Sequence, residues 1–194
     1  MRLILVMLCT ILVASCTTET ITQPAAEAYV LGKLNVVAIN NEPVSLSQTD
    51  QFAWQGDLVF SGDVKPGHAE KIKPQIKAAI SSHFASQGLG FNANITDADY
   101  LLVGLVLLEG HEKDPKHADL LFGLDPGMRS QGDYGLGTLL VGIKSAKSGN
   151  YVWRGAVQIL TSPNNELPED IRSARLENAI DALFKGFLSQ RVVM

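Results

Sequence analysis

Cysteine is scarce in this 194-residue chain, which has only Cys9 and Cys16. Both lie near the amino terminus, so the rest of the sequence can form no disulfide. An excess of positive charge is also missing, because 16 lysines and arginines stand against 20 acidic residues and the formal net charge is −4. Nucleic-acid binding and polybasic contact with anionic lipid both need a basic face, so neither is expected.

Long hydrophobic runs are missing as well. The apolar segment at residues 3–14 is twelve residues long, whereas a membrane-spanning helix takes about 20. With Arg2 before it, this segment is typical of a signal peptide. Val13, Ala14, Ser15 and Cys16 follow and resemble the lipobox of bacterial lipoproteins. The alternative is an ordinary secretory signal that happens to contain a cysteine.

The lipobox resemblance implies a lipid anchor. Residues 1–15 would be removed, and Cys16 would become the first residue of the mature chain and carry acyl chains such as palmitate. Lipoproteins of this type carry three chains, and two already give stable anchoring. Thr17 stands where an aspartate favours inner-membrane retention, so the resemblance implies the bacterial outer membrane, with the domain in the periplasm.

Three segments follow along the chain: the signal peptide at 1–15, the lipidated cysteine with a polar tether at 16–32, and one domain at 33–194. The tether to Lys33 spans about 20–25 Å as a flexible coil. Composition and periodicity within the domain predict strands at residues 34–40, 50–60, 100–108, 136–144 and 151–160. Helices are predicted at residues 70–87 and from Pro168 onward. The order β-β-α-β-β-β-α indicates an α+β fold, an antiparallel sheet with two helices packed on one face.

Pro74 is tolerated in the first helix only if that helix begins near Glu70, because the first backbone amides of a helix have no hydrogen-bond acceptor within it. In the last strand, Trp153 is expected to face the helices. Leu139, Val141, Phe84 and Leu183 are its predicted neighbours.

The sheet is predicted to be apolar on both faces. Val152, Ala156 and Leu160 would face away from the helices, and the central strand 100–108 offers aliphatic side chains to both sides. Aliphatic side chains left in water would forgo the free energy of burial, so we expect another segment or a partner to cover the second face. The candidate is an apolar stretch in the long polar loop, a possible partner-contact loop formed by Leu120, Leu121, Phe122 and Leu124. A second copy of the chain or another partner is the alternative.

Four phrases occur in order along the chain: residues 51–54 (QFAW), 98–103 (ADYLLV), 134–141 (YGLGTLLV) and 148–155 (SGNYVWRG). Together they resemble the domain-of-unknown-function 4136 family of outer-membrane lipoproteins, over about residues 50–187. The chain departs from the family pattern at the Ala-Lys-Ser-Gly turn and in the long 110–135 loop. The resemblance implies a fold and a location, and it supplies no activity and no catalytic residues.

Metal-binding side chains crowd one loop, which contains His111, Glu112, Asp114, His117 and Asp119. The spacing is not His-Glu-x-x-His, because Pro115 interrupts it, and no helix would place both histidines on one face. A solvated polar loop explains the cluster without a metal. We therefore expect no metal and no cofactor.

Other candidate catalytic groups are isolated. Asp97 and Asp99 could form an acid/base pair, because both precede a strand and project to the same side. Aspartates in turns commonly have this arrangement without any catalytic role. His83 lies at the edge of the first helix's apolar stripe without a visible nucleophile, and Arg154 could bind an anion, pair with a carboxylate or reach solvent. We expect a non-enzymatic envelope lipoprotein that binds another envelope protein or a copy of itself. A small-ligand or lipid-binding module is the alternative, and a hydrolase is least favoured.

Overall fold

The computed structural model describes residues 31–61, 67–108, 123–162 and 167–190. Residues 1–30, 62–66, 109–122, 163–166 and 191–194 lie outside this description, and Cys16 is among them. Within the described residues, neither helix has the length and apolar character that crossing a membrane would take.

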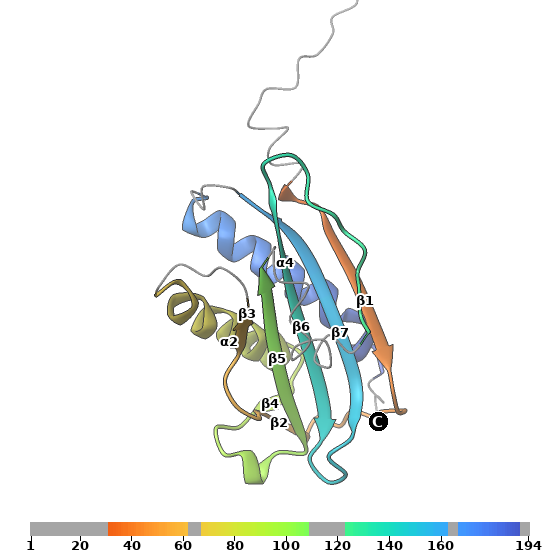
Figure 1. Ribbon diagram of the computed structural model, residues 1–194. Helices are drawn as coiled ribbons and strands as arrows, with labels where there is room; N and C mark the ends of the chain where they lie inside the picture. The colour runs from red at the N-terminus through yellow and green to blue at the C-terminus, as the bar shows by residue number, and fades with distance from the viewer. Residues whose placement is uncertain (1–30, 62–66, 109–122, 163–166, 191–194) are drawn as a thin grey trace, which may run out of the picture.

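One seven-stranded sheet forms the centre of the domain (Figure 1), in the order β1-β7-β6-β5-β2-β4 with β3 beside β5. The four long strands β1, β7, β6 and β5 pair with one another in that order, and each of these pairs is antiparallel. The strands are β1 (Leu34–Asn40), β2 (Gln51–Trp54), β3 (Val59–Ser61), β4 (Gly90–Phe91), β5 (Tyr100–Leu108), β6 (Gly135–Ser145) and β7 (Tyr151–Thr161). The predicted α+β class is therefore confirmed.

The prediction of a wholly antiparallel sheet is wrong at one side. The expected strand at residues 50–60 is two short strands, β2 and β3, and both run parallel to β5. Helix α2 lies between β3 and β5 in sequence, and a crossover of this kind returns the chain in the same direction. The sequence analysis also missed β4 and a short 3₁₀ helix, Ile95–Asp97.

Two helices, α2 (His68–Ser86) and α4 (Glu169–Leu188), cover one face of the sheet and lie behind it in Figure 1. Helix α2 begins two residues before Glu70, after Gly67 with a φ of 77°. Pro74 therefore lies beyond the first turn, where its missing amide leaves the Glu70 carbonyl without a helical partner. The observed helix, 68–86, lies within two residues of the predicted bounds 70–87 at each end.

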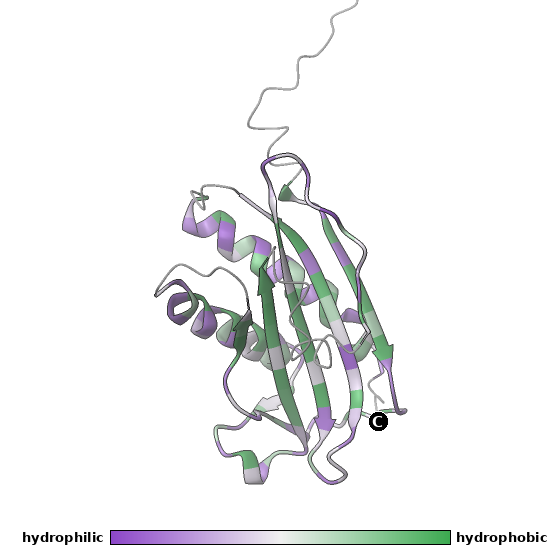
Figure 2. Cartoon of the chain, in the orientation of Figure 1, coloured by the Kyte–Doolittle hydropathy of each residue, from purple (hydrophilic) through white to green (hydrophobic). Residues whose placement is uncertain are grey.

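The core lies between the helices and the sheet. Trp153 is 1% exposed, and its ring stacks on Phe184 with 5.2 Å between centroids. Leu139, Val141, Phe84 and Leu183 belong to the same buried cluster, so the predicted placement of Trp153 is confirmed. Figure 2 shows the hydrophobic stretches along β5 and β6 that supply much of this burial.

The prediction that Val152 of β7 faces away from the helices is wrong. The register of β6 and β7 shifts between Ile143, opposite Trp153, and Lys144, opposite Tyr151. Val152 is the extra residue of this bulge, and a bulge interrupts the alternation of side chains. Val152 consequently packs in the helix-side cluster, whereas Ala156 and Leu160 belong to two separate buried clusters, as described below.

Leu31, the first described residue, packs against the sheet. Its side chain is 4% exposed and packs with Met128, Leu136 and Leu160. Arg175 of α4 donates hydrogen bonds from Nε to the carbonyl oxygen of Leu31 and from Nη2 to that of Leu160. Burial lowers the pKa of Arg175. The guanidinium thereby ties Leu31 to the end of β7.

Candidate partner-binding surfaces

The sheet face opposite the helices is partly covered by residues 123–134, here called the strap, which lie in front of the sheet in Figure 1. Leu124 is 4% exposed and packs with Leu105, Leu140 and Ala156. Met128 is 7% exposed and packs with the Leu31 cluster. Leu120, Leu121 and Phe122 lie outside the described residues, so their role as a partner-contact loop stays a prediction.

Two side-chain amides hold the strap. Gln158 on β7 is buried, and its Oε1 accepts a 2.8 Å hydrogen bond from the backbone amide of Met128. Asn35 on β1 donates from Nδ2 to the Pro126 carbonyl at 3.1 Å, in an exposed position. These two residues are register partners, so a single row of the sheet fixes the strap at two points.

Replacing Gln158 with alanine should destabilise the protein, because the buried Met128 amide would lose its acceptor. A buried donor left without a partner costs about 1–3 kcal/mol. Denaturant unfolding measures the loss, and hydrogen exchange at the Met128 amide should accelerate. Asn35→Ala is the matched control, since its exposed bond should matter less. An unchanged exchange rate at Met128 in Gln158→Ala would contradict the role given to this bond.

The two outer edges of the sheet differ. At one side the sheet ends in β4, which has two residues, and very short edge strands resist pairing with other chains. At the other side it ends in β1, whose seven residues contain no charge, proline or glycine. All seven pair with β7 without a bulge. Three of the usual devices that protect an edge strand, a charge, a proline and a bulge, are therefore missing within β1 itself.

Strand β1 is also accessible. Val36 is 38% exposed and Ile39 is 40% exposed, and alternation puts them on opposite faces of the sheet. Among the described residues, the backbone of β1 has hydrogen bonds only to β7. Its outer backbone groups, together with apolar side chains on both faces, form a surface that another strand could extend.

A groove of about 700 Å³ runs between α2 and α4. Small side chains such as Ala78 and Ser82 open it, and Leu176 and Ile180 contribute apolar lining. His83 also lines it, and its Nε2 is buried without a hydrogen-bond partner among the described residues. A general base activates a nucleophile through a direct hydrogen bond, and no serine hydroxyl of the groove makes that bond here.

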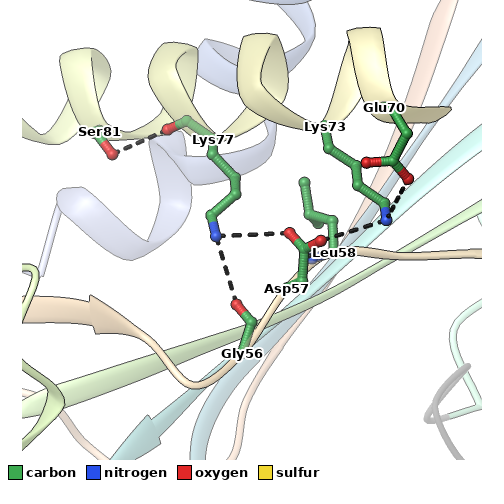
Figure 3. Close-up of polar contacts among 7 residues, drawn as sticks. All are labelled: Gly56, Asp57, Leu58, Glu70, Lys73, Lys77 and Ser81. Atoms are coloured by element: carbon green, nitrogen blue, oxygen red, sulfur yellow. Dashed lines mark hydrogen bonds and ion pairs between the residues drawn. The ribbon is translucent and has the colours of Figure 1, made fainter. Parts of the chain in front are cut away.

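Charged residues at the start of α2 have a structural role (Figure 3). Asp57 lies 3.3 Å from Nζ of Lys73 and 3.6 Å from Nζ of Lys77. Burial alone would raise the pKa of Asp57, but hydrogen bonds from Lys73 and the Leu58 amide, with the charges of both lysines, lower it overall. Lys77 also lies over the Trp54 ring, 5.3 Å from its centroid. These contacts fasten α2 to the β2–β3 connection.

The remaining candidate residues are engaged in local structure. Asp99 accepts a 2.9 Å hydrogen bond from the Gln51 amide, and Asp97 accepts one of 2.8 Å from Asn94. Arg154 donates from Nε to Asn41 Oδ1 at 3.0 Å. The candidate metal cluster of the long loop lies outside the described residues, within which no group of three potential ligands gathers.

The sequence analysis missed the edge of β1 as a binding surface. It placed a strand at residues 34–40, and the lack of charge there is visible in the sequence. Nothing in the sequence says which strand ends the sheet, however, because that depends on pairing with β7, more than 100 residues away.

The fold was compared with known proteins. No protein-family model and no curated protein matches the chain. Solved structures do, among them a DUF4136 family protein from Bacteroides thetaiotaomicron, with a TM-score of 0.49, 12% identity and coverage of 81% of this chain and 97% of that one. A PelC dodecamer from Paraburkholderia phytofirmans gives a TM-score of 0.45 and 13% identity, covering 80% of this chain and 98% of that one. Lipoprotein GNA1162 from Neisseria meningitidis gives a TM-score of 0.39 and 9% identity, covering 72% of this chain and 99% of that one.

Proposed function

We propose that this chain is a lipoprotein, anchored through Cys16 to the bacterial outer membrane, that acts by binding another polypeptide along β1 and not by catalysis. The edge of β1 is the observation that carries the binding role. An exposed strand edge adds a strand from a partner through backbone hydrogen bonds, while alternate side chains give specificity. The lipobox at residues 13–16 supports the anchor.

The tether fits this arrangement. Fourteen residues lie between Cys16 and Leu31, the first described residue of the packed domain. At 3.3–3.6 Å per residue, such a segment reaches at most about 50 Å. The domain would therefore remain beside the membrane, where the partner edge meets other envelope proteins.

The anchor has a direct test. Replacing Cys16 with alanine should remove the lipid and release the chain from the membrane fraction, because no other cysteine follows residue 16. Intact mass of the wild-type protein extracted from membranes should show an acylated cysteine at the new amino terminus. A mature mass without added diacylglyceryl would disprove the anchor.

The binding surface has a separate test. A photocrosslinking residue at position 39, on exposed β1, should capture a polypeptide in intact cells. Val36→Asp should abolish this capture, because a charge on an edge strand opposes pairing. Val59→Asp is the matched control, since Val59 on β3 is 43% exposed and lies at the other side of the sheet. Equal loss in both variants, or no capture in the parent protein, would overturn the binding role of β1.

The groove between the helices favours a second candidate function, the binding of a small ligand. Its volume suits one, and Nε2 of His83, which has no hydrogen-bond partner among the described residues, could bond to it. The charged groups Glu177, Asp181 and Arg172 also line the groove, which makes it less suited to a purely apolar ligand. A small molecule retained in the native mass of the extracted protein would support this function.

A further inference from the structure

The groove between α2 and α4 has two unlike walls. The small wall, on α2, consists of exposed neutral side chains spaced four residues apart: Ala78, Ser82 and Ser86. The acidic wall, on α4, consists of exposed carboxylates: Glu169, Glu177 and Asp181. We propose that this groove docks an α-helix of another protein, with the lysines or arginines of that helix facing the acidic wall. The inference does not depend on β1, and it gives the groove a different occupant from the small ligand considered above.

The two helices run in the same direction along the groove. Toward their carboxyl ends they meet where Phe84 of α2 packs on Phe184 of α4, with 4.9 Å between ring centroids. From this contact the lining extends back along both helices, to Gln75 on α2 and Glu169 on α4. At 1.5 Å per residue, the stretch from Gln75 to Ser86 is about 16 Å long. The groove therefore has the length of three helical turns.

The volume of the groove also suits a helix. Three turns of helix form a cylinder about 10 Å across and 16 Å long, so half of that cylinder displaces about 630 Å³. The groove holds about 700 Å³. A helix lying lengthwise would fill it while its other half stays in solvent, which is the usual geometry of a helix bound in a groove. A single small cation would contact only part of the lining.

The floor of the groove allows a helix to lie close. Ala79 and Leu176 are half-buried and pack against the core, and Ile180 is 1% exposed. These side chains can receive apolar residues from an incoming helix. The distance between packed helices depends on the size of the side chains at their contact. The short side chains of the small wall therefore leave room for the backbone of the incoming helix.

The acidic wall has no counter-charge within the described part of the chain. None of the salt bridges formed among the described residues includes Glu169, Glu177 or Asp181. Glu177 and Asp181 are one turn apart, and like charges at this spacing destabilise a helix. Arg172 also lines the groove, but it is more than one turn away from both. Cations on a docked helix would relieve this repulsion.

Charge also argues against an occupant from this chain. The tether residues 17–30 include Glu19 and Glu27 but neither lysine nor arginine, so the acidic wall would repel them. A second copy would have to offer the lysines of α2, and two of these, Lys73 and Lys77, already contact Asp57. A basic helix from another protein has neither disadvantage.

Fluorescence anisotropy tests the docking with a defined probe. The probe is a labelled alanine-based peptide of about 18 residues, long enough to form a helix alone, with lysines at every fourth position and leucines along the neighbouring stripe. A control peptide has proline at its centre, which breaks the helix and keeps the charge. Full-length protein in phosphatidylcholine nanodiscs should bind the helical peptide at least about tenfold more tightly than the proline peptide, with empty nanodiscs as the blank.

Substitutions separate the groove from the overall charge. Glu177→Gln together with Asp181→Asn should weaken binding of the helical peptide about 2- to 30-fold, the range for two exposed ion pairs. Glu42→Gln together with Asp133→Asn removes the same charge from exposed positions outside the groove lining and should leave binding unchanged. Ser82→Trp keeps the charge and should abolish binding, because the indole would occupy the groove.

Each outcome supports or overturns the docking. Binding that is lost with Ser82→Trp, and weakened only by the substitutions at 177 and 181, is the expected result. Equal binding of the proline peptide, or displacement of the helical peptide by an equimolar amount of spermidine, would show that any polycation suffices and would overturn the proposal. Equal weakening by both pairs of substitutions, or no binding at all, would overturn it too. None of these results bears on β1, which photocrosslinking at position 39 tests separately.

Discussion

Replacing Trp153 with alanine should lower the free energy of unfolding by about 3–5 kcal/mol, the usual range for a large buried aromatic. The indole is 1% exposed and is the point where β7 meets α4. It stacks on Phe184 at 5.2 Å and packs at an angle on Phe187 at 5.5 Å. Truncation would leave a cavity that both rings border, and these rings are fixed by further contacts with Phe84.

Denaturant unfolding of the wild type and the variant measures this loss, with the slope of the transition checked for change. Trp153→Phe is the conservative control and should cost less, because a ring remains between β7 and α4. Trp54→Ala is a second control, since Trp54 is only partly buried and borders the core. A loss below about 1 kcal/mol for Trp153→Ala would place the indole outside the core.

The burial of Trp153 could be predicted because two patterns agreed. Alternation in the strand put it on one face, and the stripe of α4 supplied an apolar surface for that face. The same reasoning set β1 and β5 at their observed bounds, residues 34–40 and 100–108. Both strands are bounded by polar residues, and β5 is apolar along its whole length.

Val152 shows where such reasoning stops. A bulge moves one residue out of alternation, and its sequence neighbours Tyr151 and Trp153 are as apolar as it is. No change of polarity marks the bulge, so the pattern could not reveal it. The parallel pairing of β2 and β3 with β5 could not be predicted for a similar reason. Strands of four and three residues carry little periodicity. Their direction relative to β5 follows from the crossover through α2, which the pattern of the strands does not show.

The second face of the sheet was partly predictable. An excess of aliphatic side chains on β5 indicated that something covers it, and Leu124 and Met128 of the strap are buried there. The sequence did not indicate that polar side chains would hold the strap. Gln158 stands among apolar residues of β7 with no sign of its partner, because Met128 is 30 residues away in sequence. Contacts of this range are set by the sheet register.

Gly155→Ala should destabilise the protein by about 1–3 kcal/mol through overpacking. An added Cβ would overlap Cη2 of Trp153 and lie 2.9 Å from Cδ1 of Leu183. Glycine is therefore needed at this position for close approach of the indole to β7. In the Trp153→Ala background the indole is gone, so the same substitution should cost much less and could fill part of the cavity.

A double-mutant cycle measures this dependence. We expect the two substitutions to be coupled by roughly 0.5–3 kcal/mol, the range found for residues in contact, with the double variant more stable than the sum of single losses predicts. Gly186→Ala is the matched control, because a Cβ at that exposed position of α4 meets no atom within 4 Å. It should stabilise the helix by about 1 kcal/mol in either background. Additive losses for Gly155→Ala and Trp153→Ala would show that the indole does not lie over Gly155, and the contact between β7 and α4 would then need a different description.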